Sequence, residues 1–326
     1  MNALPTVTAP RGLKVRLRRV WKHRWLFLLL LPGILYYVVF RFGPMTFLRI
    51  IFQNYSPQLE LLGQPSPWMD PWYRNFEVFF QSSDFPMLLG NTLRLAALNV
   101  AICFPIPIIL ALMLNELRQR RYKSLVQSVL YLPHFISWAV FASIMMMLLG
   151  PAPTGLVNSL IKAAGGEMIP FLESEQWFTP MYIIELVWKE SGWGTIIYLA
   201  ALSGVDVQLY EAARMDGAGR WMQLWHVTLP AIRPTIAIML ILRLGSFMDA
   251  GFEQIYLMMN SLNRNVAQVF DTYVYEVGLC GMYKPAADVS TYSYAATVGI
   301  CKSIVNSLLV LGANAATKRL GEEGLF

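Results

Sequence analysis

The segment LSGVDVQLYEAARMDGAGRWMQLWHVTLPAIRP, residues 202–234, separates two long apolar runs and has the pattern of a folded unit rather than a linker. Asp206 is expected to cap a helix that begins at Val207, because an aspartate at this position accepts a hydrogen bond from an N–H of the first turn. Gly217 is expected to end that helix, since glycine adopts the left-handed conformation of a helix C-terminus without steric cost. The first half of the segment therefore predicts one short helix followed by a glycine turn.

A second short helix is expected from near Arg220. Pro230 and Pro234 are expected to stop it and to set the beginning of the next apolar run, because proline lacks the N–H that a helix interior needs. The large apolar side chains that this second helix would expose are Trp221, Leu224 and Trp225. The whole segment thus predicts a helix-turn-helix unit that projects from the structure formed by the apolar runs.

The composition of the chain is that of a membrane protein. Of its 326 residues, 56% are hydrophobic and 14% are charged, against about 45–50% and about 25% in soluble domains. A helix needs about 20 mostly apolar residues to cross the hydrocarbon core of a bilayer. Six runs of about that length are present, at 25–45, 88–114, 125–149, 177–202, 235–258 and 292–313. The sequence therefore predicts an all-α integral membrane protein with six transmembrane helices.

The distribution of basic residues predicts which side of the lipid bilayer each connection faces. In alternate connections, 16 Lys and Arg residues fall on the side of the N-terminus and 5 on the other side. Because basic residues are retained on the cytoplasmic side, both termini and the 202–234 segment are expected in the cytoplasm. This topology also accounts for the net charge of +6, so no nucleic-acid partner is expected. The long outer segments, where aromatic residues could lie at the headgroup level or hold a partner, are 46–87, 150–176 and 259–291.

The 202–234 segment also carries a recognisable motif. Glu-Ala-Ala at 211–213 is followed four residues later by Gly217, and Val-Thr-Leu-Pro follows at 227–230. In this order, between two apolar runs and on the expected cytoplasmic side, the segment resembles the EAA loop of permease subunits of binding-protein-dependent ATP-binding-cassette (ABC) importers. Asp-Gly-Ala at 216–218 resembles the form common in sugar importers.

The resemblance extends over most of the chain and favours importers of oligosaccharides and polysaccharide fragments, such as those of alginate or pectin. It implies a multi-pass permease of the bacterial cytoplasmic (inner) membrane, which pairs with a second homologous permease as a heterodimer. It also implies two cytoplasmic ATPase subunits and an external solute-binding protein, either periplasmic or lipid-anchored. The expected domains are a basic cytoplasmic leader, 1–24, and one transmembrane domain, 25–326, whose EAA loop occupies 203–234. The stretches that carry the wider resemblance are 25–33, 91–93, 251–255, 271–275 and 296–303.

The resemblance implies that a coupling helix in the EAA loop, between the fourth and fifth transmembrane helices, is the contact through which the ATPases drive transport. Glu211 and Asp216 are expected to make polar contacts with an ATPase groove. Ala212 and Ala213 are expected to allow a close approach, since larger side chains would hold the two surfaces apart. The expected coupling residues are Glu211, Ala212, Ala213, Asp216, Gly217, Ala218, Leu229 and Pro230.

No catalytic, nucleotide or metal site is expected on this chain. A phosphate-binding loop needs G-x-x-x-x-G-K-[ST], and the nearest stretch, 299–303, lacks that glycine spacing. ATP and Mg²⁺ are therefore expected on the partner ATPase subunits, and the chain is expected to be a transport subunit rather than an enzyme. Cys103, Cys280 and Cys301 form no C-x-x-C pair, so neither a disulfide framework nor a zinc ribbon is expected.

Ionisable residues inside apolar runs are costly and are therefore candidates for the substrate path. Asp249 and Glu253 would share one face of a continuous helix, whereas Lys189 could simply pair with Glu185 four residues earlier. Carbohydrate binding needs aromatic faces beside hydrogen-bonding groups, although the second permease could supply most of them. The candidates for the path are Trp188, Lys189, Trp193, Phe247, Asp249, Glu253 and Tyr256. The other ionisable residues noted in these runs are Arg94, Glu185, Glu190 and Arg243.

Two other functions fit parts of the pattern. An ion-coupled secondary transporter of a sugar would use carboxylates such as Asp249 and Glu253, but it leaves the EAA loop without a role. A membrane enzyme that acts on glycans would need paired acids or a metal cluster at the membrane surface. The three histidines of this chain are scattered over separate segments, so the sequence favours a permease over such an enzyme.

Overall fold

The structure is a computed structural model that describes residues 21–117, 119–282 and 286–319. Within these ranges the protein is helical, and the only strand pairing is an isolated bridge between Gln53 and Trp68. Most of the expected leader, up to position 20, lies outside the described residues, as do Arg118 and Lys284 of the charge count.

The helices follow one another with short connections. Those of the first half are α2 (Arg24–Tyr37), η1 (Val38–Phe42), α3 (Gly43–Met45), η2 (Thr46–Phe52), α4 (Pro57–Leu61), α5 (Arg74–Gln81), α6 (Asp84–Leu98), η3 (Asn99–Cys103), α7 (Pro105–Glu116), α8 (Arg120–Tyr131), η4 (Leu132–Phe135), α9 (Trp138–Leu149) and α10 (Leu156–Ala163). Those of the second half are α11 (Glu175–Ser203), α12 (Val207–Met215), α13 (Arg220–Gln223), η5 (Leu224–Thr228), α14 (Leu229–Gly245), α15 (Phe252–Met258), α16 (Arg264–Ala267), α17 (Phe270–Gly278) and α18 (Thr291–Arg319).

Four continuous helical stretches are long and apolar enough to cross a membrane. They are Arg24–Phe52, Asp84–Glu116, Arg220–Gly245 and Thr291–Gly312. Two bent pairs, Arg120–Phe135 with Trp138–Leu149 and Glu175–Ser203 with Val207–Met215, bring the number to six if each pair is one span. The described residues thus form an all-helical protein with four to six candidate spans, as an integral membrane permease requires.

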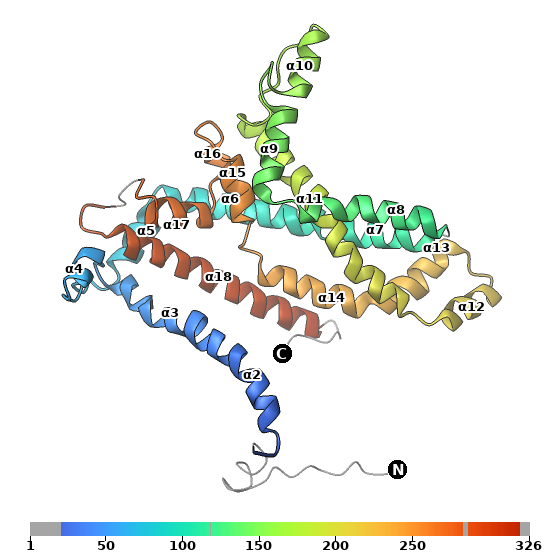
Figure 1. The fold of residues 1–326 in the computed structure, drawn as a ribbon, viewed down its shortest axis with the longest axis horizontal. Coiled ribbons are helices and arrows are strands. Elements are labelled where there is room, and N and C mark those ends of the chain that lie inside the picture. The colour runs from blue at the N-terminus through green and yellow to red at the C-terminus, as the bar shows by residue number, and fades with distance from the viewer. Residues whose placement is uncertain (1–20, 118, 283–285, 320–326) are drawn as a thin grey trace.

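The run at 125–149 does not form one straight helix, contrary to the sequence-based expectation. α8 and α9 meet at an angle of 103°, so α8 lies alongside α7 while α9 projects from the body (Figure 1). Pro133 lies in the bend and cannot donate a backbone hydrogen bond. The Lys189 ammonium on α11 binds two carbonyls at the bend, those of His134 at 3.0 Å and Ile136 at 2.5 Å. A cation at these carbonyls stabilises the bend.

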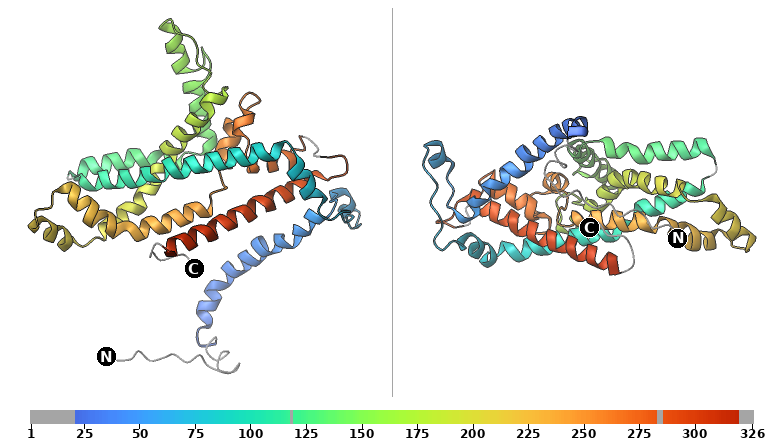
Figure 2. Two further views of the ribbon diagram at one scale, coloured as in Figure 1. Left: turned by 180° about the vertical axis from the view of Figure 1, so that it is seen from behind. Right: turned by 90° about the horizontal axis from the view of Figure 1, so that it is seen from below.

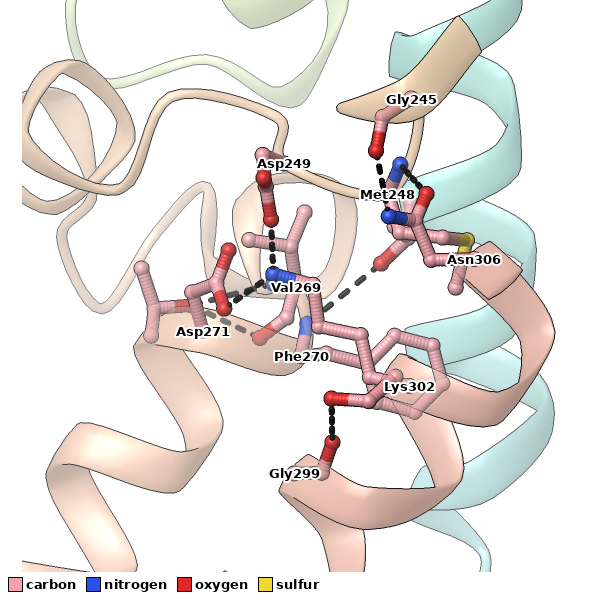
Figure 3. A network of polar contacts seen from close by, with 12 residues as sticks. Gly245, Met248, Asp249, Val269, Phe270, Asp271, Gly299, Lys302 and Asn306 are labelled. Carbon is pink, nitrogen blue, oxygen red and sulfur yellow. Dashed lines mark hydrogen bonds and ion pairs between the residues drawn. The ribbon is translucent and has the colours of Figure 1, made fainter. Parts of the chain in front are cut away.

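The run at 235–258 is also broken. α14 ends at Gly245, and α15 begins after Gly251, whose φ of +83° is left-handed. Asn306 on α18 bridges the break, because its amide nitrogen donates to the Gly245 carbonyl at 2.6 Å and its oxygen accepts from the Met248 N–H at 3.3 Å (Figure 3). A side chain distant in sequence therefore satisfies the backbone that the break exposes.

Pro230 and Pro234 do not stop the helix that begins at Arg220, contrary to expectation. Helix continues to Gly245, because Leu224–Thr228 form a π-helical turn directly before Pro230. A π-helical turn leaves out one hydrogen bond of the α-helical pattern. The proline, which has no N–H to donate, can therefore follow this turn without breaking the helix. Pro234 lies inside α14, where helices in apolar surroundings tolerate it.

The long helices run side by side along the longest axis of the molecule (Figures 1 and 2). α12 and α13 lie at one end, together with the connection between α7 and α8, and α4, α5 and α17 lie toward the opposite end (Figure 1). α11 is central and approaches its neighbours closely at two glycines. A Cβ at Gly192 would lie 2.0 Å from the Leu130 carbonyl oxygen, and one at Gly194 would lie 3.0 Å from Pro107. Only glycine permits the contact of α11 with α8 at Gly192, whereas at Gly194 a Cβ would be tight against α7.

The buried core follows the same axis in three clusters. Phe79, Tyr273 and Tyr294 lie in the first, between α5, α17 and α18. Tyr182 lies in the second, where its hydroxyl donates to the Ala250 carbonyl at 2.7 Å, and Tyr198 lies in the third, beside α7 and α14. These clusters hold α11, α14 and α18 in fixed positions, and α11 and α14 also border the cavity described below.

Candidate functional site

α12 begins as its sequence predicts. The carboxylate of Asp206 accepts a hydrogen bond from the Gln208 N–H at 2.9 Å, and helix follows from Val207. The Tyr210 hydroxyl lies 3.0 Å from the Thr228 hydroxyl, which ties α12 to the helix that returns toward the body. The EAA loop is therefore a folded unit with its own internal contacts.

The end of α12 is a Schellman motif. Gly217 has a φ of +80°, and its N–H donates to the Arg214 carbonyl at 3.0 Å. The Ala218 N–H donates to the Ala213 carbonyl at 2.9 Å. These two bonds satisfy carbonyls that the last helical turn leaves free. The predicted turn is thus confirmed, and a left-handed residue with no Cβ is what the turn needs.

Charged and apolar side chains share the surface of the EAA loop. Glu211, Ala212 and Asp216 are exposed, whereas Ala213 and Ala218 are half-buried. Of the two residues expected near the start of α14, Pro230 is exposed and Leu229 is half-buried. The tryptophans of the second helix are exposed as expected, but Leu224 is half-buried. The most exposed apolar side chains are Met215 at 89%, Trp221 at 76% and Val207 at 66%, followed by Trp225 at 63%. An exposed apolar patch rimmed by charges is typical of a surface that binds a partner protein.

A separate cavity of about 270 Å³ lies between α7, α11 and α14. Its walls are mostly aliphatic, and its charged residues are Glu190 and Arg243. The aromatic residues that line it are Phe104, Trp193 and Tyr198, and two serines, Ser191 and Ser246, also line it. A mostly apolar cavity with a few polar groups is typical of a small-ligand site.

One wall of this cavity joins α11 to the bend between α8 and α9. The ring of Trp193 stacks on that of His134, with centroids 4.7 Å apart and planes 8° apart. The Nδ1 atom of His134 lies 3.2 Å from a carboxylate oxygen of Glu190. Trp193 remains 48% exposed, so a face or edge of the indole is open to a ligand.

Glu185 and Lys189 do not form the ion pair that their spacing allowed. Glu185 accepts a hydrogen bond from the Gln254 amide at 3.1 Å, and Lys189 binds the carbonyls in the α8–α9 bend. The Lys189 ammonium also lies 5.1 Å from the centroid of the Trp138 ring. Both side chains are buried, so Lys189 is a structural residue here and does not line the cavity.

Asp249 and Glu253 do not share a helical face, because Asp249 lies in the break between α14 and α15. The Lys302 ammonium on α18 pairs with Asp249 and also with Asp271, which lies 2.6 Å away (Figure 3). Glu253 is exposed in the first turn of α15. The sequence-based pairing of two like carboxylates is therefore wrong, and a cation from α18 is the partner of the first one.

An aromatic cluster lies beside this ion pair. The rings of Phe252 and Tyr256 stack with centroids 5.5 Å apart, and the Tyr275 ring lies 5.3 Å from Phe252 and 5.0 Å from Tyr256. A cavity of about 410 Å³ opens next to the cluster and is lined by Phe252, Asp271 and Tyr275, among others. Phe247 packs against the buried cluster of α5, α17 and α18 instead.

The seven expected substrate-path residues thus fall into two groups. Trp188, Lys189 and Trp193 belong to α11, whereas the other four lie in or near the break before α15. Trp188 is 46% exposed and packs edge-on against Phe141, with ring centroids 5.1 Å apart. Only Trp193 of the seven lines the cavity between α7, α11 and α14.

Several polar residues of these regions were not among the expected path residues. Lys302 lies in the sixth apolar run, so the rule that selected the other ionisable residues also applies to it. His134 directly follows Pro133, which marks the bend. Asn306 and Asn99 act on backbone or side chains far away in sequence, and no local pattern identifies them.

Comparisons with known proteins agree with the EAA motif. Residues 104–321 match the family described as "Binding-protein-dependent transport system inner membrane component". Protein LplB of Bacillus subtilis (strain 168) is 47% identical over 324 residues, which cover 99% of this chain and 97% of that protein. YteP of the same strain, a polygalacturonan/rhamnogalacturonan transport system permease protein, is 47% identical over 94% of this chain and 91% of its own length.

A solved structure agrees with the fold as well. A chain of a bacterial alginate ABC transporter, in complex with an alginate pentasaccharide-bound periplasmic protein, aligns with a TM-score of 0.83 and 36% identity over 96% of this chain and 99% of that chain. The family predicted from the EAA motif is therefore confirmed. The chain belongs to the inner membrane components of binding-protein-dependent transport systems, and is a transport permease rather than an enzyme.

Proposed function

We propose that this chain is one permease subunit of an ABC importer that carries oligosaccharides or polysaccharide fragments across the bacterial inner membrane. The observation that carries the proposal is the EAA loop, which is folded, exposed and placed at the end of the helix bundle (Figure 1). In this proposal, α12 is the coupling helix and docks in a groove of a cytoplasmic ATPase subunit. Two such ATPases bind and hydrolyse ATP with Mg²⁺, and this chain transmits the resulting movement.

The substrate class follows from the relatives. One is named for polygalacturonan and rhamnogalacturonan transport, and the aligned structure belongs to a transporter of alginate. These substrates contain uronic acids, so we propose an oligomer of acidic sugars as the cargo. Trp193 with the cavity of α7, α11 and α14 forms one part of the path, and the aromatic cluster of α15 and α17 forms another.

The proposed topology has six spans with both termini in the cytoplasm. In this topology the α8–α9 pair counts as span three and α11 as span four, α12 lies outside the bilayer, and residues 25–326 form one transmembrane domain after a basic leader at 1–24. The end of the molecule that holds the EAA loop also holds the basic connection between α7 and α8, as the charge distribution requires (Figure 1).

A second, homologous permease completes the path in this proposal. α2, which is described throughout its length, has no buried residue, although it is almost wholly apolar. α9 also exposes large apolar side chains, with Met146 at 67% and Met147 at 69%. Lipid covers part of these surfaces, and the second permease of a heterodimer covers the rest.

The outer segments are the proposed docking surface for a solute-binding protein. A cavity of about 700 Å³ opens between the α9–α10 arm and residues 260–262, and it lies on the side opposite to the EAA loop in the proposed topology. Asn158 braces this arm, because its side chain accepts from the Ile169 N–H at 2.9 Å and donates to the Ile169 and Gly150 carbonyls, each also at 2.9 Å. Such a surface is rigid enough to receive a partner.

The experiment is affinity purification of the tagged chain from its native membrane in mild detergent, followed by mass spectrometry and an ATPase assay. We expect a second permease and an ATPase in the sample, and ATP hydrolysis that rises when binding protein and oligogalacturonide are added. Recovery of the chain alone, with sugar uptake driven by an ion gradient, would contradict the proposal and favour an ion-coupled carrier.

A further inference from the structure

One cation of the helix bundle stands apart from the others in its contacts. Arg243 lies near the C-terminal end of α14 and lines the cavity between α7, α11 and α14. Its guanidinium donates to the side-chain oxygen of Asn99 on η3. An arginine has five N–H donors in a planar fork, so this one neutral acceptor leaves most of its hydrogen-bonding capacity available.

The other cations near the middle of the bundle are compensated. Lys302 pairs with Asp249 and Asp271, and Lys189 binds the carbonyls of the α8–α9 bend. Among the described residues, no carboxylate lies within 4.0 Å of the Arg243 guanidinium, which binds one neutral acceptor where the Lys189 ammonium binds three carbonyls. Because an uncompensated charge within a membrane span is costly, an anion supplied from elsewhere is expected to compensate it.

The surroundings of Arg243 match one kind of anion. The cavity offers the partly exposed indole of Trp193, which can stack on the apolar face of a sugar ring. Glu190, on the same cavity wall, lies 3.2 Å from His134 and can accept hydrogen bonds from sugar hydroxyls. A cation, an aromatic face and a hydroxyl acceptor together suit a sugar that carries a carboxylate.

We propose that Arg243 is the residue that recognises the carboxylate of a uronic acid unit as the oligosaccharide passes through this cavity. The inference rests on the proposed function and adds the chemistry of selection to it. The guanidinium fork binds both carboxylate oxygens, and Asn99 orients the guanidinium by accepting a hydrogen bond from one of its terminal nitrogens. Arg243 thereby makes the permease itself selective for acidic over neutral oligomers, separately from any selection by a binding protein.

The test compares two substrates that differ only in charge. The complete importer, with its partner permease, ATPases and binding protein, is reconstituted in liposomes. Uptake of trigalacturonate and of its neutral methyl ester is measured for the wild type, Arg243→Gln and Arg243→Lys. The binding protein is the same throughout, so its own preference cancels when the acidic-to-neutral uptake ratios of two variants are compared.

We expect Arg243→Gln to lower this ratio by about tenfold or more, which is the effect of losing one charged hydrogen-bonding pair. Arg243→Lys is expected to give an intermediate ratio, because it keeps the charge and loses the fork. Arg94→Gln is the matched control, since Arg94 donates to the Val266 carbonyl and does not line the cavity. Its ratio is expected to equal that of the wild type.

Three results would overturn the inference. One is an equal loss of uptake for both substrates in Arg243→Gln. Another is a wild type that carries the neutral ester as fast as the acid. The third is failure of Arg243→Gln to co-purify with the second permease while Arg243→Lys does, which would assign the compensating anion to a carboxylate of that subunit. Failure of the proposed function is distinct, because the wild type would then carry neither oligomer and its ATP hydrolysis would not respond to either.

Discussion

The amide N–H of Ala218 donates to the carbonyl of Ala213 at 2.9 Å and closes the end of α12. This bond fixes the direction in which the chain leaves the helix, so that the second helix of the EAA loop begins at Arg220. Glu211 precedes this closed turn and Asp216 lies within it, and both are exposed. The small residues of the EAA motif thus have a structural role as well as the docking role proposed for them.

Gly217→Ala is expected to disturb this turn. The φ of +80° is unfavourable for any residue with a Cβ, and the cost is about 1 kcal/mol. No atom lies within 4 Å of the added methyl group, so strain and not collision is the cause. We expect weaker co-purification of the ATPase and lower stimulated hydrolysis. Gly219→Ala is the control, because Gly219 has a φ of −71° and equally open space, and its variant is expected to behave as the wild type.

Gly192→Ala is expected to destabilise the bundle itself. Its Cβ would lie 2.0 Å from the Leu130 carbonyl oxygen, so α11 and α8 would have to separate. Overpacking of this kind costs about 1–3 kcal/mol and occasionally more. A lower thermal midpoint in detergent, measured by fluorescence-detected size exclusion, checks this. Gly90→Ala has open space around it and is expected to keep the wild-type midpoint, and equal midpoints for the two variants would contradict the packing.

Lys302→Met is expected to leave two carboxylates without their cation. Removing one partner of a buried charge pair costs several kcal/mol. Because Asp249 is 58% exposed, we expect a smaller loss of about 1–3 kcal/mol. Adding Asp271→Asn should recover part of this loss, because one of the two uncompensated charges is then removed. Thermal midpoints of the two single variants and the double variant provide the check. Strictly additive losses would show that these residues do not interact.

The outer surface holds a pH-dependent contact between α5 and the segment before α18. The guanidinium of Arg74 lies 2.9 Å from the carboxylate of Asp288 and lowers the pKa of that carboxyl. A carboxyl whose folded pKa is lowered contributes stability above its unfolded pKa, near 3.8, and loses it as the pH falls through the folded value. Asp288→Asn is therefore expected to lower the thermal midpoint slightly at pH 7. The difference from the wild type should shrink as the pH falls below about 3.8 and vanish once the pH lies below the lowered pKa of the folded protein, whereas a constant difference would exclude the ion pair as its cause.

Local signals in the sequence predicted the EAA loop well. Asp206 and Gly217 determine the ends of α12 through contacts with residues at most five positions away, so one sequence suffices to locate them. The break after Gly245 is different, because its backbone is satisfied by Asn306 about 60 residues later. An apolar run continues across that break, and hydrophobicity alone therefore predicts one helix where the structure has two.

The partners of the charged residues inside the apolar runs also could not be predicted from the sequence alone. The spacing of Glu185 and Lys189 predicts a pair on one helical face, but each contacts another part of the chain instead. Lys189 binds carbonyls in the bend between α8 and α9, and Glu185 accepts from Gln254 on α15. These choices depend on helix packing, which the periodicity of a single helix does not contain.

The most direct test of the account is the position of the EAA loop against the ATPase. Met215→Cys places a thiol at the end of α12, and Leu61→Cys places one on α4 at the opposite end of the molecule. The native side chains at both positions are 89% exposed. In the assembled importer, a thiol-to-amine cross-linker at Met215→Cys is expected to yield a product with the ATPase subunit, and Leu61→Cys is expected to yield none. Cross-linking of the ATPase through Leu61→Cys and not through Met215→Cys would contradict the proposed role of the loop and the orientation of the whole chain.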